Sequence, residues 1–324
     1  MKKRLLIVTT CLAVAWMAAC VGCAANADGG EAVGDPPAVE LQPGEVRVFR
    51  GSDGTLVEWN EMIAALSEAE AVVIGENHGH PLGLAFAAEL WSGVLARRDQ
   101  AVLSMEFFNR DEQSRVDDYL AGLCDEAAFR KGTGRESDSV YPPGHRAMVE
   151  AAKAKGRPVI AANSPRVYVR TARLESFERL GSLTEDQRRM FRVPDELPTG
   201  KYRADFDVVM SGGGVEPRGD QREHEASEEE RARLDASFRA QSTWDWTMAE
   251  SVARGIDRQG TPVVHVVGRF HSDFEGGLVL ALTKIRPGTR VVIVSVVDAR
   301  SRSLKDEDRG RADFVAYVGP LGKH

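Results

Sequence analysis

The chain has very little cysteine. Of four cysteines in 324 residues, only Cys124 lies beyond residue 23. A domain with a single cysteine has no internal disulfide, so its stability must come from core packing. The 43% content of apolar residues is enough for a sizeable core. The absence of a C-x-x-C-H sequence excludes a covalently attached c-type haem.

The chain also lacks any concentration of positive charge. Lysine and arginine are spread along it without a basic stripe or interleaved aromatic residues, and the formal net charge is −7. Nucleic acid is therefore not an expected partner. The length suits one large domain, or one domain that carries an insertion.

The apolar run at residues 5–19 is too short for a membrane span, which needs about 20 residues. Three basic residues, Lys2, Lys3 and Arg4, precede it. A short apolar run after a positive start is typical of a secretory signal peptide.

Small residues before Cys20 and Cys23 resemble the lipobox of bacterial lipoproteins, in which the cysteine is acylated. We therefore predict a lipoprotein signal peptide at residues 1–23, lipidation at Cys20 or Cys23, and a flexible Gly-, Ala- and Pro-rich tether at 24–44. The protein would then be lipid-anchored to a bacterial membrane in the cell envelope, on its periplasmic side or outer surface. The alternative is ordinary cleavage after the A-x-A pattern at 25–27.

Short apolar runs alternate with amphipathic stretches over the predicted domain, residues 45–324. The predicted strands are 71–75, 101–105, 158–162, 262–267, 290–297 and 313–318. Continuous apolar strands that alternate with helices predict an α/β fold with a mainly parallel central sheet and helices on both faces. The charged, helical sequence at about 165–240 predicts an inserted helical subdomain.

Polar residues follow four of these strands directly. Glu76 and His78 come after the first strand, Glu106 after the second, Asn163 after the third and His271 after the fourth. Ligands of open α/β sheets bind at the carboxyl ends of the parallel strands. Burying these groups without partners would cost several kcal/mol, so their convergence predicts a ligand site or a polar cleft.

Several other polar residues have simpler explanations. Asn163 could cap the helix after it, and His80 before Pro81 could simply be exposed. We interpret His265, inside an apolar strand, as a core histidine. We interpret His145 and His224 as surface or lid residues.

Six segments in order resemble the ChaN-like group of the Tiki/TraB/erythromycin-esterase superfamily. They are the G-E-x-H motif at 75–78, the glutamate-bearing strand at 104–108, the helix from 111 to 122, the N-x-P-R segment at 163–166, the Q-x-x-x-D-x-x-M-A helix at 241–249 and the G-x-x-H motif at 268–271. The sequence departs from the group's pattern at 79–83, where a further polar run and histidine are usual.

This resemblance implies an α/β domain with a helical insertion and a role in haem uptake. It places the superfamily's polar site on Glu76, His78, Glu106 and His271. It also implies that the protein binds haem or a related iron ligand, and that two copies can dimerise around haem. Haem binding needs an apolar cleft and an axial ligand. The candidates for that ligand are Tyr119, Tyr141, Tyr202 and His80.

A hydrolase is the alternative function, with Glu76, His78, Glu106 and His271 as catalytic residues. Glu76, His78 and His271 could hold a divalent metal, leaving a carboxylate as general base for a bound water. Without metal, a histidine oriented by a glutamate could activate water itself. The spacing is not that of a compact motif such as H-E-x-x-H. A scaffold that has lost its chemistry is a third possibility.

Overall fold

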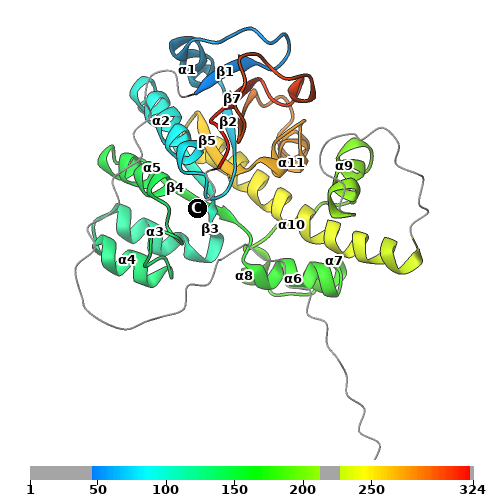
Figure 1. The fold of residues 1–324 in the computed structure, drawn as a ribbon. Helices are drawn as coiled ribbons and strands as arrows, with labels where there is room; N and C mark the ends of the chain where they lie inside the picture. The colour runs from blue at the N-terminus through cyan, green and yellow to red at the C-terminus, as the bar shows by residue number, and fades with distance from the viewer. Residues whose placement is uncertain (1–45, 212–226, 322–324) are drawn as a thin grey trace, which may run out of the picture. The chain divides into compact units, whose positions relative to one another are not determined.

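A seven-stranded sheet forms the centre of the part of the chain that the computed structural model describes, residues 46–211 and 227–321 (Figure 1). The strand order is β1-β7-β6-β2-β5-β3-β4, and β1 is antiparallel to β7 while the other neighbours are parallel. The strands are β1 (Arg47–Arg50), β2 (Ala71–Glu76), β3 (Val102–Asn109), β4 (Val159–Asn163), β5 (Val263–Gly268), β6 (Val291–Val297) and β7 (Phe314–Tyr317). The predicted α/β class is therefore confirmed.

The central strands are rich in valine because both faces of the sheet are covered. All six residues of β2 are buried, as are all six of β5. Side chains alternate between the faces, so Val72 and Ile74 join one core cluster while Ala71 and Val73 join the other.

One face of the sheet is covered by α1 (Trp59–Glu68), α2 (Pro81–Arg97) and α5 (Pro143–Ala154), with α3 (Gln113–Leu120) and α4 (Glu126–Gly132) packed beside them. The other face is covered by α10 (Glu228–Arg258) and α11 (Gly277–Ile285). Figure 1 shows α10 as a long helix on the side of the sheet away from α2 and α5. These layers match the predicted covering of both faces.

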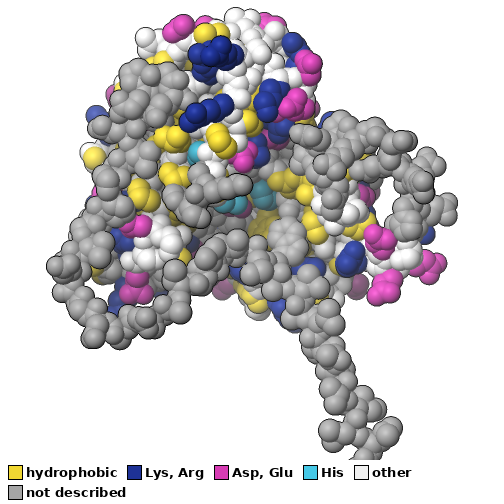
Figure 2. Space-filling model, in the orientation of Figure 1, with side chains coloured by type: hydrophobic (Ala, Val, Ile, Leu, Met, Phe, Trp, Pro, Cys, Tyr) yellow, Lys and Arg dark blue, Asp and Glu magenta, His cyan; other side chains and the backbone are white. Residues whose placement is uncertain are grey.

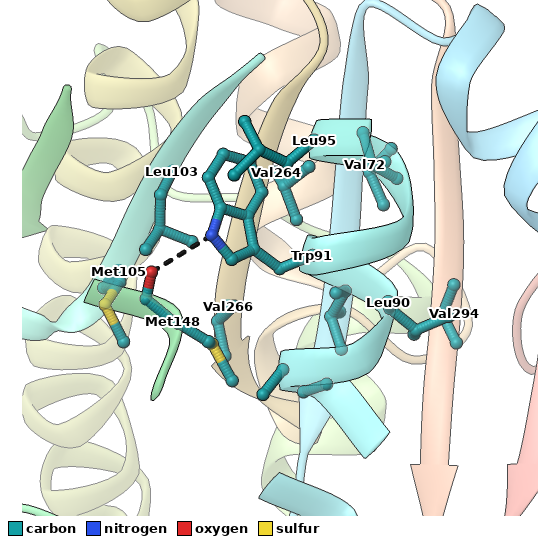
Figure 3. Packing of buried hydrophobic residues seen from close by; sticks show 14 of the residues in the cluster. Val72, Leu90, Trp91, Leu95, Leu103, Met105, Met148, Val264, Val266 and Val294 are labelled. Carbon is teal, nitrogen blue, oxygen red and sulfur yellow. Dashed lines mark hydrogen bonds between the residues drawn. The ribbon is translucent and has the colours of Figure 1, made fainter. Parts of the chain in front are cut away.

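Trp91 of α2 lies at the centre of the first core cluster (Figure 3). Its side chain is fully buried among Leu95, Leu103 and Val264. Its indole N–H donates a hydrogen bond to the carbonyl of Met148 in α5, at 3.1 Å. This bond satisfies the one polar atom of the ring and ties α2 to α5.

The chain between β4 and β5 is helical where it is described. It holds α6 (Arg166–Leu174), α7 (Phe177–Gly181), α8 (Glu185–Arg188), α9 (Lys201–Met210) and the start of α10. The aromatic residues Tyr202 and Phe206 pack α9 against Phe238 of α10 in a small cluster of their own. The predicted insertion at about 165–240 spans these helices.

Some expectations fall on residues that the structure does not describe. The predicted signal peptide 1–23, the tether 24–44, both candidate lipidation sites and His224 lie outside the described residues. Within the described part, no helix combines the length and apolar character that a membrane span requires.

Strand β1 and helices α1, α4 and α11 were not among the predicted elements. Strand β1 has only four residues, and it forms through antiparallel pairing with β7, from Arg47 opposite Tyr317 to Arg50 opposite Phe314. Such a pairing depends on a strand more than 250 positions away and leaves little local pattern. The remaining short elements are the 3-10 turns η1 (Arg110–Glu112), η2 (Arg269–His271) and η3 (Asp306–Asp308).

Candidate functional site

The polar residues predicted from the strand ends lie at the carboxyl edge of three adjacent strands. Glu76 ends β2, Glu106 lies near the end of β3, and η2 brings His271 back directly after β5. Gly75 makes this arrangement possible, because a methyl group at residue 75 would lie 2.4 Å from the hydroxyl of Ser272. The turn after β5 can therefore cross close to the end of β2.

Glu76 is the centre of the first half of the site. Its side chain is 3% exposed, and its two carboxylate oxygens accept hydrogen bonds from two imidazoles. His78 donates from Nδ1 at 3.1 Å and His145 of α5 donates from Nε2 at 2.9 Å. The His78 side chain is 69% exposed, whereas that of His145 is 7% exposed.

This geometry perturbs the pKa of both groups that it joins. Burial raises the pKa of Glu76, but attraction to His145 and the hydrogen bonds from His145 and His78 outweigh that effect and lower the pKa to about 2. The hydrogen bond to Glu76, with the charges of Glu106 and Glu76, raises the pKa of His78 to about 9 against the opposing effect of desolvation. Glu76 is therefore a carboxylate and His78 an imidazolium near neutral pH.

His271 is the centre of the second half. Its Nδ1 lies 2.6 Å from Oδ1 of Asp245, a fully buried carboxylate in α10, and its Nε2 lies 3.7 Å from Oε1 of Glu106. The other oxygen of Asp245 accepts a hydrogen bond of 2.5 Å from the hydroxyl of Tyr202 in α9. The other oxygen of Glu106 accepts one of 2.7 Å from the backbone N–H of Gly268.

The second half is also electrostatically coupled. Burial lowers the pKa of His271, but the charges of Asp245 and Glu106 outweigh it, so the pKa is raised overall. Burial raises the pKa of Asp245, against the effect of His271. Burial and the nearby Asp245 charge raise the pKa of Tyr202 well above its ordinary value, so Tyr202 remains a neutral donor.

His78 lies between the two halves. The charge of Glu106 acts on it directly, and a methyl group at residue 268 would lie 2.8 Å from Nε2 of His78 and 3.6 Å from Oε2 of Glu106. Gly268 thus lets the imidazole lie close to the end of β5. Figure 2 shows histidine side chains near the middle of the viewed face, beside hydrophobic ones.

The structure brings Glu76 together with His78, and Glu106 together with His271. The proposed metal set of Glu76, His78 and His271 is not supported. Both oxygens of Glu76 accept from histidines, and His271 faces Asp245 and Glu106 instead. Across residues 46–211 and 227–321, no three His, Cys, Asp or Glu side chains are grouped as metal ligands.

The candidate axial ligands are all buried. Tyr119 donates to Glu150 and Tyr202 to Asp245, while Tyr141 is 1% exposed. The simpler interpretation of His80, as an exposed residue, was wrong. His80 is the N-cap of α2, where its Nδ1 accepts from the N–H of Gly83 and its Nε2 donates to the carbonyl of Gly319 at 2.9 Å.

Three further residues had simple interpretations. His265 is fully buried beside the hydroxyl of Ser104, at 2.9 Å, and burial lowers its pKa to about 3, as a neutral core histidine requires. Asn163 accepts from the N–H of Ser164, whereas the N-cap of α6 is Pro165. The interpretation of His145 as a surface residue was wrong, because it is buried against Glu76.

Asp245 and Gln241 were not predicted as site residues, and Tyr202 was predicted only as a candidate axial ligand. Gln241 and Asp245 are fixed positions of the Q-x-x-x-D-x-x-M-A pattern, so the signal was present although neither was assigned to the site. Tyr202 lies in the predicted insertion, and no pattern marks it as a partner of Asp245.

The geometry of the site allows two kinds of chemistry. His78 presents an exposed imidazole, and His271 is an oriented imidazole that can serve in acid–base chemistry.

Comparison with known proteins gives one family and several similar structures. A family model described as haem-binding uptake, Tiki superfamily, ChaN matches residues 62–282. The solved structure of cofacial haem binding to ChaN of Campylobacter jejuni has a TM-score of 0.61 at 14% identity, over 84% of this chain and 96% of that one. No match was found among curated proteins.

Two other solved structures are similar at lower scores. The type III effector HopBA1 has a TM-score of 0.43 at 12% identity, over 87% of this chain and 100% of that one. The erythromycin esterase EreC, in its open conformation, has a TM-score of 0.40 at 14% identity, over 85% of this chain and 83% of that one.

Proposed function

Because the chain belongs to the ChaN family of haem-binding uptake proteins in the Tiki superfamily, we propose that it binds haem at the carboxyl edge of its sheet, with His78 as the axial ligand. Haem iron is commonly held by an imidazole, and the protein tunes that imidazole through the group that hydrogen-bonds to it. Haem is here the cargo of the protein.

The observation that carries the proposal is the exposed, oriented imidazole of His78. Its Nδ1–H is bound to Glu76, so Nε2 is the nitrogen left for an external ligand. Every other described histidine and tyrosine is buried except Tyr168, which is half-buried and packs on Phe191. His78 thus replaces the four axial candidates that the sequence suggested.

The side chain of His78 is exposed, but its Nε2 lies beside the backbone at the end of β5. Gly268 has no side chain, and the backbone there approaches Nε2 closely. A carboxylate behind a ligating imidazole strengthens its donation to a metal. Protonation of His78 opposes this binding. Below its pKa of about 9 the imidazole carries a proton on Nε2, and this proton must leave before Nε2 can bind iron.

The proposed setting is the cell envelope, with uptake of haem or a related iron ligand by a lipid-anchored protein. The lipobox-like sequence before Cys20 and Cys23 supports it. Mass spectrometry of the mature N-terminus should find an acylated cysteine at one of these positions. An unmodified start at Asp28 would contradict the anchor and leave the haem site untouched.

Haem titration tests the binding function. The wild-type chain should shift the Soret band at micromolar protein, and His78→Ala should weaken binding strongly. Tyr168→Phe is the matched control, because among the described residues it removes the other accessible phenol or imidazole, and it should bind haem as the wild type does. No Soret shift in the wild type would contradict haem binding, and loss in Tyr168→Phe alone would contradict the assignment to His78.

A homodimer around haem is part of the proposal, and the cofacial haem of the similar ChaN structure supports it. Light scattering should show a haem-dependent rise from the mass of one chain to that of two. Haem binding with no change in mass would contradict the dimer and leave the binding site in place.

A second candidate function is metal-independent hydrolysis at His271. The favouring observation is the 2.6 Å contact between His271 and the buried Asp245, with Glu106 at 3.7 Å from the other ring nitrogen. A histidine that a carboxylate orients is a common general base for water. A hydrolysis screen of the wild type, His271→Ala and Glu76→Ala tests it, and an inactive wild type would remove it.

A further inference from the structure

Haem ligation by His78 leaves the second half of the site without a role. Asp245 is completely buried although it is a carboxylate, and burial of an unpaired charge is costly. The structure offsets this cost through hydrogen bonds to both of its oxygens, one from His271 and one from Tyr202. Tyr202 comes from α9, outside the layers that cover the sheet.

The contact between α9 and α10 depends on a glycine, which has no side chain. A methyl group at Gly277, the first residue of α11, would lie 2.2 Å from Oδ2 of Asp245 and 2.4 Å from Cζ of Tyr202. Any larger residue there would separate the phenol from the carboxylate. Gln241, one turn before Asp245, also hydrogen-bonds to Tyr202 and lies 3.1 Å from Nδ1 of His271.

We propose that Tyr202 and Asp245 are positioning residues that hold the His271 imidazole as its Nδ1–H form, so that docking of α9 completes this half of the site. The carboxylate can only accept, so the hydrogen on Nδ1 lies between His271 and Asp245. With its hydrogen given to Asp245, Nδ1 cannot also accept from the amide nitrogen of Gln241. Gln241 donates instead to the oxygen of Tyr202, and Tyr202 donates to Asp245. The result is one hydrogen-bonded chain that ends with Nε2 of His271 directed at Glu106.

Several charged or titratable groups face His271, and they come from different elements of the fold. Asp245 lies on α10, Glu106 on β3, His78 after β2 and His265 on β5. Tyr202 is the member that acts on His271 only through another residue. If the hydroxyl of Tyr202 is removed, Asp245 loses a hydrogen-bond donor. The negative charge of Asp245 is then less stabilised, so it attracts the imidazolium of His271 more strongly.

Heteronuclear NMR of the imidazole nitrogens tests the proposal without haem, in the chain from Asp28 onward, which keeps the whole unit Ala38–His324. The His271 signals are assigned from their loss in His271→Gln. In the wild type, the neutral ring should carry its hydrogen on Nδ1, whereas free histidine favours Nε2. An Nε2–H ring in the wild type would overturn the proposal before any variant is made.

Two variants of α9 separate positioning from packing. Tyr202→Phe keeps the ring in its cluster and should shift the His271 pKa upward. Phe206→Leu, one turn later in the same cluster, should lower stability and leave that pKa at the wild-type value. Equal shifts in both variants, or none in Tyr202→Phe, would overturn the proposal. Because no haem is present, failure of the haem function would not change these results.

Discussion

Haem affinity should depend steeply on pH if His78 is the axial ligand. Iron and a proton compete for Nε2, so the apparent affinity follows the fraction of neutral imidazole. With a pKa of about 9, that fraction rises about 90-fold between pH 6 and pH 8. With the ordinary value of 6.5 it would rise only about 4-fold.

The assay is a Soret titration at several pH values between 6 and 8, with His78→Ala measured beside the wild type. The variant reports how pH changes haem itself and any binding that does not involve His78. The ratio of the two affinities isolates the contribution of the imidazole. This ratio should rise with pH, because the raised pKa keeps the ring protonated at the lower end of the range.

Glu76→Gln is the second arm of this experiment. The amide can still accept a hydrogen bond from one histidine, but it has no charge to hold the proton on His78. The pH dependence should therefore flatten toward the 4-fold limit and affinity at pH 7 should increase. A wild-type ratio that stays constant from pH 6 to pH 8, or a Glu76→Gln profile as steep as the wild type, would refute the reasoning.

Three further predictions concern the fold and the setting of His78. Trp91→Ala should lower the free energy of unfolding by about 3–5 kcal/mol in urea titration, since it empties a fully buried site, and a loss below about 1 kcal/mol would contradict its central place. Glu76 has a lowered pKa of about 2, so it stabilises the fold above pH 4.5, by an amount on the order of 3 kcal/mol, and this is lost as pH falls toward 2. Urea titrations at pH 3 and pH 6 should therefore differ less in Glu76→Gln than in the wild type. Gly268→Ala should weaken haem binding by displacing the His78 ring, whereas Gly181→Ala, where a methyl group meets nothing within 4 Å, should not.

Much of the sheet could be predicted from the sequence because its strands are apolar runs that end abruptly in polar residues. The predicted strand at 71–75 corresponds to β2, and Glu76 is the residue at which it ends. The same reasoning placed Glu106 and His271 at one edge, since the carboxyl ends of parallel strands meet there. Their contact at 3.7 Å depends on strand order, with β3 and β5 as neighbours.

The partners supplied by helices were harder to predict, because a helix has no edge that fixes where its residues point. His145 nevertheless had a usable signal. The buried residues of α5 are His145, Met148, Val149 and Ala152. This three- and four-residue spacing is typical of a helix face that packs on a core. A histidine on such a face needs a buried partner, and Glu76 is that partner. Tyr202 had no comparable signal, because its contact depends on the small size of Gly277.

The alternation of side chains along a strand explains why the site has two halves. Glu76 follows the same face as Ile74 and meets α5, whereas Glu106 comes one residue after Met105, which shares the core of Ile74. Glu106 therefore points to the opposite face, where α10 supplies Asp245. Two carboxylates at one edge of the sheet are thus kept apart, each with its own imidazole. The charges of both carboxylates act on His78. Its exposure and its raised pKa follow from its position beyond the end of β2. A ligand that reaches His78 therefore meets the electrostatic field of both faces at once.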